Sequence, residues 1–499
     1  MKSFKEVEKN RFFYHKYQNR KTVHRSSLIA PKFKGCITNI SFLNHFLLKR
    51  NYKEVALKIS GIDKKGNLSD SILISIDKPI VYSLNLEEFF QKENDITQYL
   101  IEFFSNNNLY IPFPAVVVNH IGKDFVNSVH SYNRILNDIF EDDLVNKHMV
   151  LEASVDFMIN DKYDTFFNFV SGIENLDTKI NIIYENKNIK LKKNIPLKIN
   201  RLNNKNYYLS KVFPKNHNSK FQNYRNVVKI LQPRQNLFYG RLLAGIVNKK
   251  TGAFAANHSY YDSSKIKEYF KNNTSSKVYP YFENCSNLIR MYPIMSPSKI
   301  SIFIRVITKN KIHISKKIRL KSPGKEPASL DVNDIVNNMK IKNVTAFQVV
   351  AESEKKIPTR VNHQLIYGPK NSKSKLFTSI NVSLANKEIM VPKHKVGFTW
   401  GQVLLNKDYE SRVGVCFYKS KGLRDLVTVE FYNKNGLVRS IKKKLSPDSS
   451  LIFKTKDLKK ISSNDAFLWF KISSKRFDLT AFSFHWHKKS ENSSGEHSF

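Results

Sequence analysis

Four side chains near the C-terminus are the best suited to binding a metal. The run His485-Trp486-His487 places two imidazoles on one face if it is a β-strand, because alternate strand residues point to the same side. Glu491 and His497 follow shortly after. Imidazole and carboxylate groups ligate zinc, iron and copper. No other motif calls for a cofactor, so a transition-metal site at His485, His487, Glu491 and His497 is a hypothesis to weigh against a solvent-exposed rim of amphipathic side chains.

An Asn-His pair recurs at the ends of predicted strands. The three pairs are Asn119-His120, Asn257-His258 and Asn362-His363, and the fourth strand ends at His485. Together with His130 and Trp486, these residues are candidate ligands for a sugar or a metal on a polar rim. The alternative is that Asn and His close the strand and bond to loop backbone groups. Because the position recurs in every copy, we favour this structural role.

These residues would be positioned by four segments that share one order of features. Each segment opens with an alternating apolar strand and a hairpin turn, such as Asp63-Lys-Lys-Gly-Asn67 or Asn433-Lys-Asn-Gly436. Asn and Gly favour such turns because they tolerate positive φ. A second strand then reaches a proline, and three copies continue with a short acidic helix. The third strands are predicted at Tyr99–Ser105, Leu242–Asn248, Phe347–Ser353 and Leu468–Ser473.

The period-two alternation predicts an all-β protein, a tandem array of about four β-sandwich domains of the immunoglobulin or fibronectin type III kind with a few short helices. The predicted divisions are a basic N-terminal segment 1–45 and repeats 46–145, 146–278 (divergent, with an insertion), 279–395 and 396–499, the last with a His-rich end. A helix is expected over Asn133–Phe140. The tract Ser490–Phe499 is expected to be a loose tail or a last loop.

The formal net charge is +41, with 66 Lys against 17 Arg. Such a charge attracts polyanions in a salt-dependent way, but base recognition in nucleic acids favours Arg. The second strands at Asn188–Lys198, Lys311–Lys321 and Leu437–Lys444 alternate apolar and basic residues. They predict either a surface for anionic polysaccharide or Lys residues that protect exposed strand edges from aggregation.

Several function classes lack support in the sequence. There is no Gly-rich phosphate loop, no G-x-S-x-G and no H-E-x-x-H motif. Cys416 and Trp469 lie in apolar strands and are expected in the core. The carboxylates Glu141, Asp142 and Asp143 could act on a glycosidic bond, although a local charge balance explains them as well.

No transmembrane segment is apparent. No secretory signal is visible either, so a cytoplasmic location is the default expectation, with export by another route or a virus particle left open.

The leading interpretation is therefore a binding or scaffolding protein without catalysis of its own. Its expected partners are an anionic polysaccharide, a surface glycan, or a cell-surface or particle assembly. The first alternative is a metal-dependent or carboxylate-based enzyme acting on carbohydrate. The second alternative is non-specific nucleic-acid binding, which only the charge favours.

Overall fold

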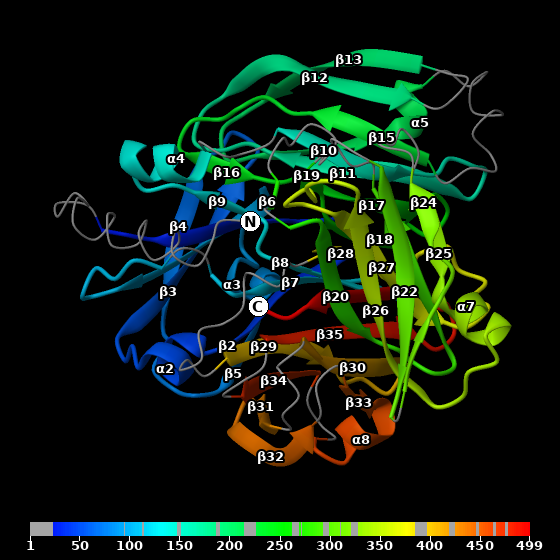
Figure 1. Ribbon diagram of the computed structural model, residues 1–499. Coiled ribbons are helices and arrows are strands. Elements are labelled where there is room, and N and C mark those ends of the chain that lie inside the picture. Colours follow the sequence, from blue (N-terminus) through cyan, green and yellow to red (C-terminus); the bar gives the residue numbers. More distant parts are fainter. Residues whose placement is uncertain are drawn as a thin grey trace. The chain divides into compact units, whose positions relative to one another are not determined.

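The computed structural model describes residues 23–93, 95–111, 114–146, 151–185, 190–213, 226–261, 269–270, 272–292, 299–309, 311–320, 328–384, 397–418, 425–445, 449–462, 466–474 and 478–499. These residues form four sandwiches of antiparallel strands (Figure 1). The chain divides into two compact units, Lys2–Tyr261 and Asp262–Phe499, and each unit holds two sandwiches. The predicted all-β tandem array of about four sandwiches with a few short helices is confirmed.

The first unit contains the first and second sandwiches. In the first, one sheet has the order β1 (Ser26–Pro31), β6 (Ile96–Ser105), β3 (Val55–Asp63), β4 (Leu68–Ser75), and the other β5 (Val81–Asn85), β2 (Ile37–Leu43), β7 (Val117–Ile121), β8 (Val126–His130). In the second, the sheets are β13 (Lys190–Ile199), β12 (Leu176–Glu185), β15 (Asn226–Leu231), β10 (Glu152–Phe157), β19 (Tyr260–Tyr261), and β14 (Asn204–Tyr208), β11 (Tyr163–Val170), β17 (Leu243–Asn248), β18 (Phe254–His258).

The second unit contains the third and fourth sandwiches. The third has β20 (Thr274–Pro280), β26 (Val344–Ser353), β22 (Ile300–Thr308), β23 (Ile312–Ile314), with β24 (Ile318–Leu320) also on β22, and a second sheet β25 (Ala328–Asp331), β21 (Cys285–Met291), β27 (Asn362–Pro369), β28 (Ile380–Ser383). The fourth has β29 (Gly397–Leu404), β34 (Phe467–Ser474), β31 (Asp425–Asn433), β32 (Gly436–Leu445), and β33 (Ser450–Lys454), β30 (Tyr409–Tyr418), β35 (Asp478–His487), β36 (Ser493–His497).

All four sandwiches share one topology. If the strands of each sandwich are numbered 1 to 8 in chain order, one sheet runs 1-6-3-4 and the other 5-2-7-8. The paired strands β9 (Asn133–Ile135) and β16 (Phe238–Gly240) lie outside this count, and β24 shares position 4 with β23. In the second sandwich β19 extends the first sheet at its edge. The predicted opening hairpins are strands 3 and 4 of each copy. The N-terminal segment 1–45, which the sequence left unassigned, contributes strands 1 and 2 of the first sandwich.

A short helix follows strand 5 in every copy. These helices are α3 (Leu86–Phe89), α5 (Leu209–Val212), α7 (Val332–Asn338) and α8 (Thr455–Lys459), so the three predicted short helices are confirmed and a fourth is added. In the described part of the first unit, two further helices are α2 (His45–Arg50) and α4 (Ile139–Asn146). In the described ranges, no helix combines the length and the apolar composition that a membrane crossing requires.

Three sequence expectations need correction. In the second copy, strand 6 is β15, and the predicted third strand is strand 7 (β17); consequently His258 ends strand 8 there, whereas His120 and His363 lie on strand 7. The cause is the polar stretch 214–235, which makes up the predicted insertion of this copy but contains the apolar run of β15. Its residues 214–225 lie outside the described ranges.

The other two corrections concern the secondary structure predicted for Asn133–Phe140 and for Ser490–Phe499. The expected helix Asn133–Phe140 is instead β9 (Asn133–Ile135) followed by α4, because the Asn133 amide bonds both the N–H and the C=O of Ile29 at 2.8 and 3.0 Å and holds the chain extended. The expected tail at 490–499 forms β36, which pairs with β35.

The apolar faces meet inside each sandwich, as the alternation requires. In the fourth sandwich, for example, Val429 and Phe470 of one sheet pack with Val415 of the other. Trp469 and Cys416 are buried, so their predicted core positions are confirmed. In the second unit, Phe482 and Phe484 of β35 join the core of the third sandwich, which ties the two sandwiches of that unit together.

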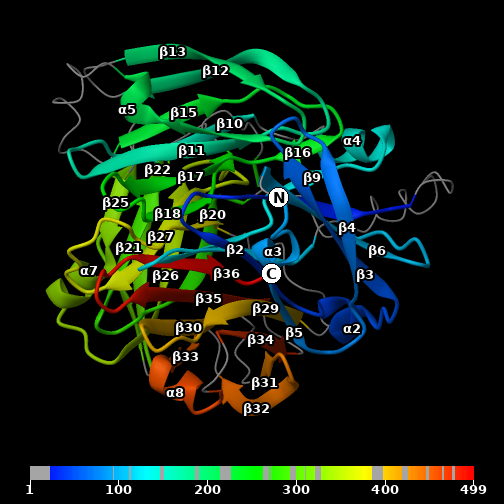
Figure 2. The same cartoon turned by 180° about the vertical axis from the view of Figure 1, so that it is seen from behind.

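The two sandwiches of the first unit are also joined by an apolar contact. Ile29 and Leu100 of the first sandwich form a buried cluster with Val170 and Leu202 of the second, and with Phe238 of β16 (Phe238–Gly240). Strand β16 pairs with β9, and the two strands lie side by side in both views (Figures 1 and 2).

The turn between β3 and β4 is part of this joint. Asn203 and Asn200 of the second sandwich donate to the C=O groups of Asp63 and Lys64 at 3.1 and 2.9 Å. Gly66 has φ +84°, and a Cβ atom placed there would lie 2.3 Å from the carbonyl oxygen of Arg201. The turn is therefore seated against the second sandwich by backbone contacts that only glycine permits.

We predict that Gly66→Ala destabilises this joint. Its matched control is Gly252→Ala, because Gly252 has a similar φ of +74° but a Cβ atom added there would meet nothing within 4 Å. The control should lose about 1 kcal/mol of unfolding free energy from backbone strain alone. Gly66→Ala should lose about 1–3 kcal/mol more from the clash, measured by denaturant unfolding. Equal losses in the two variants would show that the turn is not held against Arg201.

Candidate functional site

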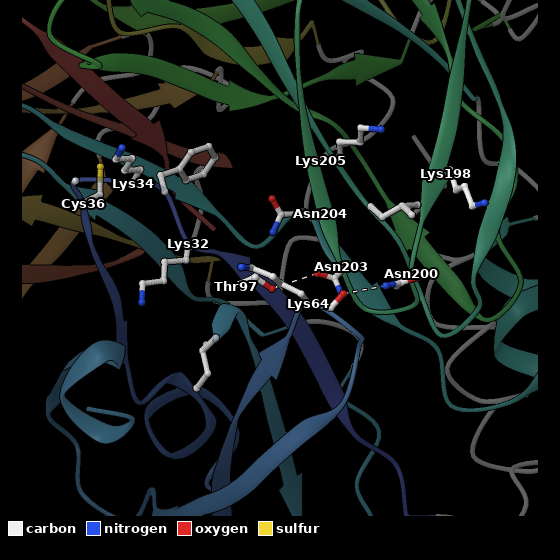
Figure 3. Close-up of a pocket in the computed structure, with 14 residues that line it drawn as sticks. Lys32, Lys34, Cys36, Lys64, Thr97, Lys198, Asn200, Asn203, Asn204 and Lys205 are labelled. Atoms are coloured by element: carbon white, nitrogen blue, oxygen red, sulfur yellow. Dashed lines mark hydrogen bonds between the residues drawn. The ribbon is translucent and has the colours of Figure 1, made fainter. Parts of the chain in front are cut away.

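A basic pocket opens between the two sandwiches of the first unit. Its volume is about 730 Å³, and it is bounded by the β1–β2 and β3–β4 turns, the start of β6, and the strands β13 and β14 (Figure 3). β13 and β14 are edge strands of the two sheets of the second sandwich. Five exposed lysines surround the pocket, and we call them the pocket lysines: Lys32, Lys34, Lys64, Lys198 and Lys205.

The polar floor of the pocket is made of asparagines whose amides are already bonded. Thr97 Oγ1 donates to Asn203 Oδ1 at 3.1 Å, and Asn204 Nδ2 donates to Gln98 Oε1 at 2.8 Å. Asn168 Nδ2 in turn donates to Asn204 Oδ1 at 2.8 Å. This network fixes the floor in one arrangement, so the ammonium groups above it are the adaptable part of the site.

The charge of the pocket is of one sign. No Asp or Glu lines it, and no ion pair joins a pocket lysine to a described carboxylate. Each Lys ammonium is a compact point charge with three donors on a flexible stem. The pocket can therefore bind sulfate, carboxylate or phosphate groups of a ligand, with weak demands on their orientation.

Cys36 also lines the pocket, but it is not activated as a nucleophile. Burial and then the nearby Glu87 carboxylate raise the pKa of the Cys36 thiol to about 11. Its thiolate fraction at neutral pH is therefore small, and thiolate is the reactive form. The other two thiols, Cys285 and Cys416, are buried.

The strand-7 histidines lie inside the fold. His120 Nε2 is 3.1 Å from the Pro31 carbonyl oxygen, and His363 Nε2 is 2.7 Å from the Tyr279 hydroxyl. Burial lowers the pKa of His120 to about 4 and that of His363 to about 3, so both rings are neutral at neutral pH. Their neighbours Asn119 and Asn362 are buried as well. This is the strand-closing arrangement that the recurring position favours, and a ligand role for these residues stays a prediction.

Asn257, His258 and His130 come together at one end of the first unit. The Asn257 side chain accepts a hydrogen bond from the backbone N–H of His258 at 2.7 Å. The rings of His130 and His258 have centroids 4.4 Å apart. Two of the candidate ligand residues that are distant in sequence thus lie in contact.

The C-terminal candidates are placed on β35 and the turn after it. His485 and His487 both face the Tyr409 ring, with centroids 5.8 and 5.2 Å away, so they share a side as expected. Glu491 instead accepts a hydrogen bond from the backbone N–H of Lys373 at 2.6 Å. His497 Nδ1 lies 2.8 Å from the Ser498 carbonyl oxygen.

Within the described part of the second unit, no three such side chains bring ligand atoms within 4.8 Å of one another. The structure therefore does not assemble the four-residue metal set. Trp486 lies over the Arg412 guanidinium, whose carbon is 5.0 Å from the ring centre.

Two carboxylates of the acidic run, those of Glu141 and Asp142, form structural contacts, and Asp143 is exposed. Glu141 is buried and forms an ion pair with Arg134 at 3.0 Å. Asp142 binds the Arg234 guanidinium at 3.1 Å and accepts from the Leu237 N–H at 3.0 Å. These contacts tie α4 to its neighbours, which is the charge-balance interpretation of these carboxylates.

The predicted basic strands are edge strands. β13, β23 and β32 each end the order of their sheets. Lys442, Lys443 and Lys444 on β32 are exposed, as is Lys198 on β13. The alternation of apolar and basic residues identified Lys198 in the sequence, but it did not identify the other pocket lysines. These come from separate segments, and no local pattern distinguishes them from the other Lys residues of the chain.

No protein-family model and no curated protein matches this chain. Among solved structures, it is similar to the FN1–FN3 domains of chicken CNTN1, at 8% identity over 68% of this chain and 94% of that one, with a TM-score of 0.10. It is also similar to a tetra-tandem repeat in the extending region of a large adhesion protein, at 9% identity over 95% and 98% of the two chains, with a TM-score of 0.11.

A third similar structure is dimeric latent PorU from Porphyromonas gingivalis, at 9% identity over 88% of this chain and 40% of that one, with a TM-score of 0.14. TM-scores this low carry no argument. The fold and the candidate site therefore rest on the strands and side chains of this chain alone.

We predict that Cys36 is alkylated slowly at pH 8. A pKa of about 11 in place of the ordinary thiol value of 9.0 lowers the thiolate fraction about 100-fold, and the greater nucleophilicity of a more basic thiolate recovers part of this. The net rate with iodoacetamide should be about tenfold below that of a free cysteine, and it should keep rising with pH up to about 10. Peptide mass spectrometry at several pH values measures it. A rate that levels off near pH 8 would show that the pocket lysines depress the pKa of the thiol instead.

Proposed function

We propose that the protein is a non-enzymatic binding or scaffolding protein that engages an anionic glycan in the basic pocket. The observation that carries this proposal is the set of pocket lysines around a fixed asparagine floor, with no carboxylate among the lining residues. Sulfate or carboxylate groups spaced along a sugar chain would meet ammonium groups from both sandwiches at once. Sugar hydroxyls would contact the asparagine floor of the pocket.

The basic surface continues beyond the pocket along β13. Lys190, Lys192 and Lys193 are exposed on the same edge strand that contributes Lys198. Lys190 lies eight residues before Lys198 and strand residues rise about 3.3 Å each, so these charges extend the basic surface by roughly 26 Å. A glycan chain of several sugar units could therefore occupy the pocket with one end and follow the strand with the other.

Nucleic acid fits the pocket less well. Proteins that hold single strands combine a basic groove with aromatic side chains on which bases stack. Among the described residues that line this pocket, the one aromatic residue is Phe33, and it is buried against Phe254 and His120, with ring centroids 4.9 and 4.8 Å away. Without an exposed aromatic face, the site favours anions on a sugar chain over stacked bases.

The test compares two triple variants that remove the same charge. Lys64→Gln/Lys198→Gln/Lys205→Gln alters the pocket, and Lys442→Gln/Lys443→Gln/Lys444→Gln alters β32 in the second unit. Binding of a size-defined heparin oligosaccharide is measured by calorimetry at two salt concentrations, with neutral dextran as the uncharged probe. The pocket variant should bind about tenfold more weakly, a loss of about 1.4 kcal/mol, while the β32 variant stays within about twofold.

Two outcomes would contradict the proposal. Equal weakening by both variants would mean that heparin responds to net charge and not to the pocket. Equal or tighter binding of a single-stranded oligonucleotide, lost in the same pocket variant, would replace the glycan with nucleic acid as the ligand class.

A further inference from the structure

The last strands of the two sandwiches in the first unit run next to each other. β8 and β18 are each an edge strand of their sheet. The Asn127 side chain on β8 accepts a hydrogen bond from the Ala256 N–H on β18 at 2.7 Å, and the Phe125 and Phe254 rings have centroids 5.1 Å apart. The ends of the two strands are thus held together by contacts that do not involve their terminal histidines.

His130 and His258 occupy equivalent positions at these strand ends. His130 pairs in register with Val117, and His258 pairs with Leu243. A serine follows each histidine, and its N–H continues the sheet: Ser131 donates to Val116 O at 2.9 Å and Ser259 to Leu242 O at 2.6 Å. The backbone beneath both imidazoles is therefore fixed, which limits the rearrangement that a shared ligand would require.

We propose that His130 and His258 form a binding site for a divalent transition-metal ion. Ring nitrogens of the two residues lie within 4.8 Å of each other, and the ring planes meet at 74°. A tetrahedral ion with bonds of about 2.0–2.1 Å needs its two nitrogens about 3.4 Å apart. Rotation of the partly exposed His130 ring about its Cβ–Cγ bond would change this separation without moving either strand. This inference is independent of the proposed glycan binding.

The surroundings of His258 orient its ring. Nδ1 lies 3.1 Å from the Ser259 carbonyl oxygen, so in the Nδ1–H form the ring donates to that oxygen and Nε2 carries the lone pair for a metal. Arg241 NH1 is 3.2 Å from the same Nδ1 and opposes the metal, both as a competing donor and as a cation. The Arg241 Nε also donates to the Tyr239 hydroxyl at 2.9 Å, which holds the guanidinium beside the ring.

The ligand set defines the class of ion. Two neutral imidazoles suit copper, nickel and zinc, whereas magnesium and calcium prefer oxygen ligands. His258 is buried but His130 is partly exposed, so the remaining coordination positions face solvent on the His130 side. Those positions could take water or a donor from a bound ligand.

The test is zinc binding to the full chain. Metal-free protein is titrated with Zn²⁺ by calorimetry, and thermal unfolding is followed with and without Zn²⁺. Wild-type protein should bind with a dissociation constant of about 1–50 μM and gain thermal stability, since an ion bound only by the folded state raises the midpoint. His130→Ala and His258→Ala should each weaken binding at least about tenfold and abolish the shift. His313→Ala, a histidine of the second unit, is the control and should match wild type.

A second measurement keeps the proposal testable if His258→Ala, which alters a buried residue, misfolds. Cu²⁺ bound to wild-type protein should show nitrogen hyperfine structure from two imidazoles by electron paramagnetic resonance, and His130→Ala should reduce this to one. Zinc affinity that is unchanged in folded His130→Ala, or copper that shows no paired imidazole signal in wild type, would overturn the proposal.

Discussion

The joint between the first two sandwiches is the constraint on which both sites depend. Contacts between neighbouring domains are commonly polar and permit relative motion. Here Leu100 and Leu202 lie in one buried apolar cluster, and the Gln98 side chain donates to the carbonyl of that same Leu202. The pocket lysines belong to both sandwiches, and so do His130 and His258. The distances within the set of pocket lysines and within the histidine pair are kept only while the two sandwiches stay packed at this joint. The stability of the joint and ligand binding at both sites therefore depend on the same contacts.

The histidines of strand 7 illustrate why a recurring residue serves the fold first. His120 bonds Pro31 at the end of β1, and His363 bonds Tyr279 on β20. In both sandwiches strand 7 lies in one sheet and strand 1 in the other, so the imidazole bridges the two sheets. A neutral imidazole suits this role because it makes the hydrogen bond without the cost of burying a charge. The lowered pKa values of both rings follow from the same burial.

The sequence predicted features that depend on neighbouring residues better than features that depend on residues far apart in the chain. The hairpins of strands 3 and 4 were predicted because alternation and turn residues such as Gly66 are local signals. Strand 6 of the second copy was missed because the apolar run of β15 is short and follows a long polar stretch, while a neighbouring strand offered a similar spacing to histidine. The contact of His130 with His258 arises from the docking of two sandwiches, and no local pattern encodes it.

The net charge of +41 explains why the protein attracts anions, but it does not explain how one anionic ligand would be selected over another. At physiological salt the Debye length is about 8 Å, so lysines on exposed edges of different sheets act nearly independently on a distant anion. Selection requires charges that are close together, that lack competing carboxylates, and that surround groups already fixed in place. The pocket meets these conditions because its asparagine floor is bonded internally and its lysines stand on two sandwiches that the joint holds together. The many edge lysines then keep the sheets from pairing with other chains, while the few around the pocket provide the geometry that a specific anionic ligand needs.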